Sequence, residues 1–62
     1  MRITNALYKA LEMQGNDEET IIELIEEMVE SVLDQYDPEE VLYGYGLDSD
    51  YVLDLIEYCE SM

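Results

Sequence analysis

The chain lacks histidine, tryptophan and phenylalanine, and it has a single cysteine, Cys59. One cysteine cannot form an internal disulfide, so no covalent cross-link holds the fold, which fits a reducing compartment. Zinc and iron sites need clusters of cysteine and histidine, so the sequence predicts no metal and no cofactor. Because no histidine or basic residue stands near Cys59 to activate it, we expect a packed thiol rather than a nucleophile.

Positive charge is almost absent. Arg2 and Lys9 are the two bases, against 17 acidic residues in a chain of 62, which gives a formal net charge of -15. This balance excludes direct binding to nucleic-acid phosphates or to an anionic membrane surface. The sequence has no apolar run of membrane-spanning or signal-peptide length, so it predicts a cytoplasmic protein.

The length leaves no room for a second domain or a large catalytic cleft, so we do not expect an enzyme. Hydrophobic residues nevertheless make up 48% of the chain. That share is too high for a disordered acidic tail, so residues 1–62 are predicted to fold as a single acidic domain.

Apolar residues recur at helical spacing, and we find no strand pattern, so the predicted fold is all-α, a small bundle of three to four short helices. A first helix is predicted over 3–14. Thr4 or Asn5 would cap its start, and Gly15 would follow its end in a left-handed conformation.

Three more helices follow in the prediction. The second covers 17–35, with Asn16 as the N-cap of a capping box. An aspartate-proline pair at 37–38 starts a short third helix that should stop before Gly44. The fourth covers 49–60 and would be capped by Asp48 or Ser49.

The second predicted helix carries acids on one face and apolar residues on the other. With Ile21 toward the core, the apolar arc contains Leu24, Ile25, Met28, Val29, Val32 and Tyr36, with Ile22 and Leu33 at its edges. The opposite arc contains Glu19, Glu23, Glu26, Glu27, Glu30 and Asp34. No lysine or arginine occurs after Lys9, so the helix forgoes the attraction that Glu–Lys pairs four residues apart normally give. We interpret this arc as a surface kept negative for a basic partner, with a solvated solubility face as the alternative.

The fourth predicted helix adds aromatic residues to this picture. Val52, Leu55, Ile56 and Cys59 fall on one face and are predicted to meet the core. Tyr51 and Tyr58 fall near the opposite face, beside Asp54 and Glu57, a composition common at protein interfaces. We therefore add these four residues to the predicted partner-binding set. The pair Tyr43 and Tyr45 is a second aromatic candidate, or simply a packed turn.

The segment around residue 48 begins like two known motifs. An EF-hand loop starting at Asp48 needs glycine where Leu53 stands and glutamate where Cys59 stands, so calcium binding of that kind is excluded. The Gly-Leu-Asp-Ser sequence at 46–49 resembles the phosphopantetheine attachment segment of acyl carrier proteins, which implies attachment at Ser49. The leucine that usually follows that serine in the family is replaced by Asp50 in this chain.

The chain as a whole resembles the small acidic proteins of phages and mobile elements that mimic DNA, such as anti-CRISPR, anti-restriction and uracil-DNA glycosylase inhibitor proteins. The resemblance lies in composition: shortness, net charge and carboxylate-bearing helices. It implies an inhibitor that occupies the nucleic-acid-binding surface of a basic host defence or DNA-processing protein. The alternative is a non-enzymatic acidic interaction module, antitoxin-like or a small adaptor, acting as a monomer or a homodimer.

Overall fold

The computed structural model describes residues 4–35 and 37–61. Within this part of the chain the fold is all-α without strands, as predicted. It comprises α1 (Ala6–Met13), α2 (Glu18–Leu33), α3 (Pro38–Gly44), a 3-10 turn η1 (Ser49–Tyr51) and α4 (Val52–Ser61). Ile3 and Tyr36, which the sequence pattern assigns to apolar helix faces, lie outside the described residues.

A side-chain oxygen caps the start of each helical segment except α4, which continues from η1. The carboxylate of Asp17 accepts from the backbone N–H of Thr20 at 2.9 Å at the start of α2. The predicted cap of this helix, Asn16, is wrong by one residue, because its side-chain amide instead donates to the Leu11 carbonyl at 2.8 Å. The predicted caps Asn5, Asp37 and Asp48 are confirmed. Local sequence therefore defines where the helices begin.

The helix ends depend on three residues with positive φ. Gly15 follows α1 with a φ of 96°, as predicted, and Gly46 follows α3 with a φ of 77°. The prediction that α3 stops before Gly44 is wrong, since Gly44 is its last residue. Gln35 adopts a φ of 75° after α2, a conformation that normally favours glycine.

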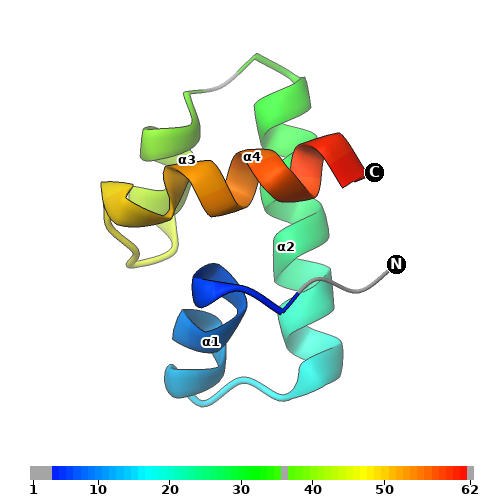
Figure 1. The fold of residues 1–62 in the computed structure, drawn as a ribbon, viewed down its shortest axis with the longest axis vertical. Helices are drawn as coiled ribbons and strands as arrows, with labels where there is room; N and C mark the ends of the chain where they lie inside the picture. Colours follow the sequence, from blue (N-terminus) through cyan, green and yellow to red (C-terminus); the bar gives the residue numbers. More distant parts are fainter. Residues whose placement is uncertain (1–3, 36, 62) are drawn as a thin grey trace.

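The longest helix, α2, is the element against which the others pack (Figure 1). It contacts α1, α3 and α4, and α4 also contacts α1 and α3. In Figure 1, α1 lies beside the N-terminal half of α2, while α4 crosses its C-terminal half. One long helix thus has one face in the core and its opposite face open to solvent.

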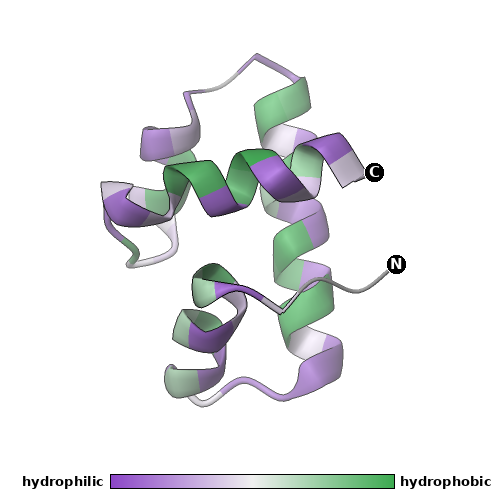
Figure 2. Ribbon diagram, in the orientation of Figure 1, coloured by the Kyte–Doolittle hydropathy of each residue, from purple (hydrophilic) through white to green (hydrophobic). Residues whose placement is uncertain are grey.

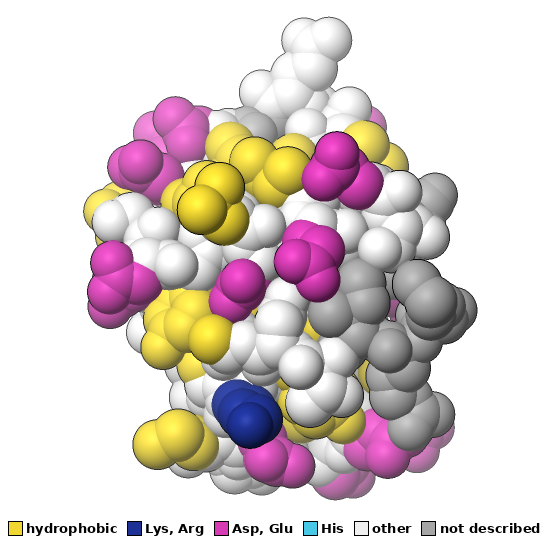
Figure 3. All heavy atoms as spheres, viewed as in Figure 1, with side chains coloured by type: hydrophobic (Ala, Val, Ile, Leu, Met, Phe, Trp, Pro, Cys, Tyr) yellow, Lys and Arg dark blue, Asp and Glu magenta, His cyan; other side chains and the backbone are white. Residues whose placement is uncertain are grey.

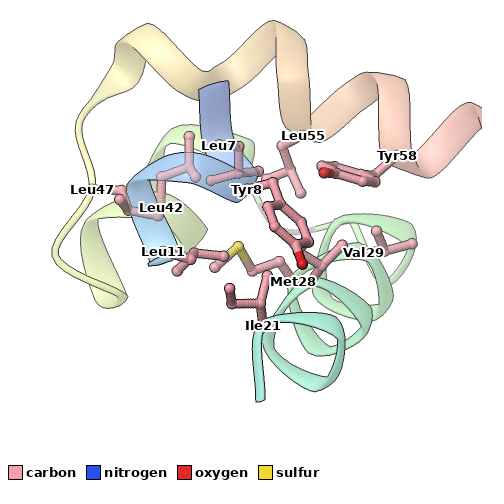
Figure 4. Packing of buried hydrophobic residues seen from close by; sticks show 11 residues of the cluster. Leu7, Tyr8, Leu11, Ile21, Met28, Val29, Leu42, Leu47, Leu55 and Tyr58 are labelled. Carbon is pink, nitrogen blue, oxygen red and sulfur yellow. The ribbon is translucent and has the colours of Figure 1, made fainter. Parts of the chain in front are cut away.

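The core takes residues from every helix and from the loop before η1 (Figure 4). Met28 of α2 is fully buried, and its side chain lies among those of Leu11, Tyr8 and Ile21. The complete buried set is Leu7, Tyr8, Leu11, Ile21, Ile25, Met28, Val29, Leu42, Leu47, Leu55 and Tyr58. Within the described residues the apolar arc of α2 is confirmed, since Ile21, Ile25, Met28 and Val29 are buried and Leu24 and Val32 pack against them. At its edges, Ile22 is half-buried and Leu33 is exposed.

The orientation predicted for α4 is partly right. Leu55 is buried and Val52 and Cys59 pack against the core, as predicted, but the buried face extends to Tyr58 instead of Ile56. Leu55 and Tyr58 are the buried residues of this helix, whereas Ile56 is 37% exposed. Leu53, on the same side of α4 as Ile56, is 79% exposed. As a result, hydrophobic residues occur on both faces of α4 (Figure 2).

Candidate partner-binding surface

All six predicted acids of the second helix are exposed to solvent. They are Glu19, Glu23, Glu26, Glu27, Glu30 and Asp34, and they lie opposite the buried face of α2. Five belong to the helix itself, and Asp34 is its C-cap. We call these six residues the acidic face. Its exposure leaves each carboxylate accessible to a partner.

The stretch of sequence that forms the acidic face contains no basic residue. No lysine or arginine occurs in the sequence after Lys9, which lies exposed on α1. Four pairs in the acidic face are like charges four residues apart: Glu19 with Glu23, Glu23 with Glu27, Glu26 with Glu30, and Glu30 with Asp34. Each such pair destabilises a helix by about 0.2–0.5 kcal/mol, so the sequence gives up helix stability to keep this face negative.

Tyr45 extends the acidic face toward α3. Its hydroxyl donates to Oε2 of Glu27 at 3.1 Å. Burial, and then the neighbouring Glu27 carboxylate, raise the pKa of this phenol, so it stays a neutral donor at physiological pH. The sequence indicates Tyr45 only as an alternative contact. Its hydrogen bond to Glu27 is visible only in the folded structure.

The space between α2 and α3 contains two adjoining shallow hollows. The first is lined by Glu27, Glu30, Ser31, Asp34 and Tyr45. The second is lined by Ser31, Glu40, Val41, Gly44 and Tyr45. The two hollows share Ser31 and Tyr45 as lining residues, and we call them together the α2–α3 groove.

Two residues predicted for the partner surface instead lie at the junction of α1 and α4. Tyr58, expected on an exposed face, is only 5% exposed and belongs to the core. Asp54 is half-buried, and its Oδ2 accepts from the backbone N–H of Leu7 at 3.2 Å. The side chain of Asn5 caps the same helix end by accepting from the Tyr8 N–H. Asp54 therefore caps α1 from a position 47 residues away in the chain.

We expect Asp54→Ala to lower the free energy of unfolding by about 1–2 kcal/mol, because it leaves a helix N–H without its acceptor. Asp54→Asn keeps an oxygen at the same place and should recover most of this loss. Glu57→Ala, an exposed site on the same helix, is the control and should change stability by less than about 0.5 kcal/mol. Urea unfolding followed by circular dichroism measures all three, and equal losses for Asp54 and Glu57 would argue against the capping role.

The Tyr58 phenol makes stability sensitive to alkaline pH. Burial raises its pKa to about 12, and the charges of Asp54 and Glu57 act in the same direction. An unfolded tyrosine ionises near pH 10, so the stabilisation is complete below about pH 10 and is lost between about pH 10 and 12. We expect urea midpoints to fall over this window, and Tyr58→Phe to flatten the fall. An equally steep fall of the urea midpoint with pH in Tyr58→Phe would contradict this role of the buried phenol.

The remaining predicted residues of the fourth helix differ in exposure. Tyr51 is half-buried against the core, whereas Glu57 is exposed. Glu57 lies on the outer face of α4, which also carries Leu53, Ile56 and Glu60. Figure 3 shows this side of the molecule, where hydrophobic and acidic side chains are interspersed. Of the four residues predicted here, only Glu57 is fully available to a partner.

Cys59 is half-buried beside the core, and burial raises the pKa of its thiol. A raised pKa lowers the thiolate fraction at neutral pH, which agrees with the expected packed thiol.

Among residues 4–35 and 37–61, no three acidic or cysteine side chains gather closely enough to hold a metal ion. No helix in the same described part combines the length and apolar character that crossing a membrane requires.

Comparison with known proteins gives this chain no relative: no family model, curated protein or solved structure matches it.

Proposed function

We propose that this protein is an inhibitor that mimics DNA and blocks the nucleic-acid-binding surface of a basic host defence or DNA-processing protein, as anti-CRISPR and similar proteins do. The observation that carries the proposal is the acidic face: six exposed carboxylates on one side of one helix, with no base among them. The inhibitor is non-enzymatic, and it acts in the cytoplasm of the host cell.

The spacing of charge supports this proposal. Glu19 and Asp34 are separated by about 22 Å along α2 at 1.5 Å per residue. One strand of B-DNA places six or seven phosphates over about the same length, at roughly 3.4 Å each. The acidic face presents six carboxylates. Lysine and arginine side chains that bind a DNA strand would therefore meet a comparable charge density on α2.

The mechanism is competition. Carboxylates take the place of phosphates against the partner's basic side chains, and the net charge of -15 accelerates encounter at low salt. Binding of this kind weakens as salt rises, because the attraction acts between solvent-exposed charges.

The test is capture of partners from a bacterial lysate by the tagged protein, followed by elution with duplex DNA or with salt. We expect the captured protein to bind nucleic acid, and to be released both by DNA and by salt. Mass spectrometry identifies it. A partner that resists both treatments contradicts DNA mimicry.

The second candidate is a non-mimic interaction module, and the outer face of α4 favours it. Leu53 is 79% exposed and Ile56 37% exposed on that face. An apolar contact there, with a different protein or a second copy, would survive both DNA and salt in the same experiment.

A further inference from the structure

The α2–α3 groove differs from the rest of the acidic face in having an apolar side. Val41 and Gly44 of α3 line one part of it, and Glu30 and Asp34 line the other. Tyr45 lies in both parts, and its ring is held in place by the hydrogen bond from its hydroxyl to Glu27. Glu40 adds a further carboxylate on the α3 side. The part of the groove beside α3 therefore combines apolar surface with one carboxylate, whereas the part beside α2 carries the carboxylates of Glu27, Glu30 and Asp34.

An arginine side chain has matching chemistry. Its aliphatic stem packs on apolar surface, while its planar guanidinium stacks on an aromatic ring and donates to two carboxylate oxygens at once. Lysine has a comparable stem but a compact, strongly hydrated ammonium that neither stacks in this way nor forms a two-pronged contact. Charge and shape complementarity both favour arginine as the occupant.

We infer that the α2–α3 groove binds an arginine side chain of the partner protein, with the stem against Val41 and Tyr45 and the guanidinium against Glu30 and Asp34. This inference rests on the proposed function and specifies the partner residue that the acidic face holds. The other residues of the acidic face then contribute negative charge but no groove that fits a particular side chain.

Gly44 allows the groove to be blocked without changing any charge. A Cβ at this position meets no atom within 4 Å, and Gly44 is not among the positive-φ residues. Gly44→Leu therefore places a side chain at the groove while leaving the net charge at -15. Gly44→Ala is its control, because one methyl group leaves most of the groove open.

Substitutions of carboxylates provide a second pair of matched variants. Glu30→Gln with Asp34→Asn removes two charges that line the groove. Glu19→Gln with Glu23→Gln removes two charges from the same helix that line neither hollow. Both double variants have the same net charge, so a difference between them reports position rather than total charge.

The probe is a capped peptide with two arginines separated by glycine, compared with its lysine and citrulline counterparts in nuclear magnetic resonance titrations. We expect the arginine peptide to shift the backbone amides of Ser31, Val41 and Tyr45, and to bind at least about threefold more tightly than the lysine peptide. Gly44→Leu and the Glu30/Asp34 variant should each weaken binding at least about fivefold, because one fills the groove and the other removes its carboxylates. Gly44→Ala and the Glu19/Glu23 variant should weaken it less than about twofold.

Equal weakening by the two charge variants, with no effect of Gly44→Leu, would overturn the arginine site and leave DNA mimicry by a diffuse charged face intact. Saturable arginine binding in the groove, together with a captured partner that DNA does not release, would instead support the groove and reject the proposed function. The two conclusions are thus tested separately.

Discussion

Leu55→Ala is expected to lower the free energy of unfolding by about 2.7–5 kcal/mol, a large share of the protein's total stability. Leu55 is fully buried where α4 meets the core. Removing a buried leucine side chain leaves a cavity and costs about 2.7–5 kcal/mol. A chain of this length has a total stability of only about 3–9 kcal/mol. The substitution therefore removes a large share of this stability, and it unfolds most of the protein if the total is smaller than the loss.

Leu53→Ala is the matched control, two positions away on the same helix and 79% exposed. We expect it to change the free energy of unfolding by less than about 0.5 kcal/mol. Circular dichroism during urea titration measures both variants. Comparable losses at the two leucines would contradict the orientation of α4, in which Leu55 faces the core and Leu53 faces solvent.

The second large effect concerns binding. Replacing Glu23, Glu27 and Glu30 by glutamine and Asp34 by asparagine should weaken binding to the captured partner on the order of 100-fold, about 2.7 kcal/mol. The same change relieves all four like-charge pairs, so the free protein should gain up to about 2 kcal/mol. The amide oxygen of glutamine at position 27 can still accept from Tyr45. Interferometry at several salt concentrations measures the affinity, and thermal melts measure the stability.

Opposite effects on stability and affinity are what distinguish a binding face from a solubility face. A variant that folds better and binds equally well would show that the carboxylates only solvate the helix. The contact would then have to be sought on the outer face of α4 or at Tyr43. A matched control replaces the exposed acids Glu12, Glu39, Asp48 and Asp50 in the same way, which changes the net charge equally but leaves α2 and the outer face of α4 intact.

The sequence was sufficient to predict α2 and its exposed acids, because apolar and acidic residues there occupy separate arcs. It failed in part for the orientation of α4, where Leu53 and Ile56 increase the apolar content of the outer face. Tyr58 was misplaced because tyrosine is common both in cores and at surfaces. A helical period alone does not decide which side of such a helix meets the core.

Contacts between distant segments were beyond prediction for a different reason. Asp54 is half-buried because it caps α1, and no local pattern around residue 54 indicates that partner. Tyr45 joins Glu27 only because α3 packs on α2. The choice of Asp17 over Asn16 as a cap has a local cause instead, since Asn16 donates to the carbonyl of Leu11, five residues earlier at the end of α1.

The capping of α1 by Asp54 also bears on synthesis at the ribosome. Chains emerge N-terminus first, so α1 is made well before the residue that completes its first turn. Until α4 follows, Leu7, Tyr8 and Leu11 have only part of the neighbours that bury them in the finished fold, those that α2 provides. We therefore expect the chain to complete its folding only after α4 has been made, when Asp54 can cap α1.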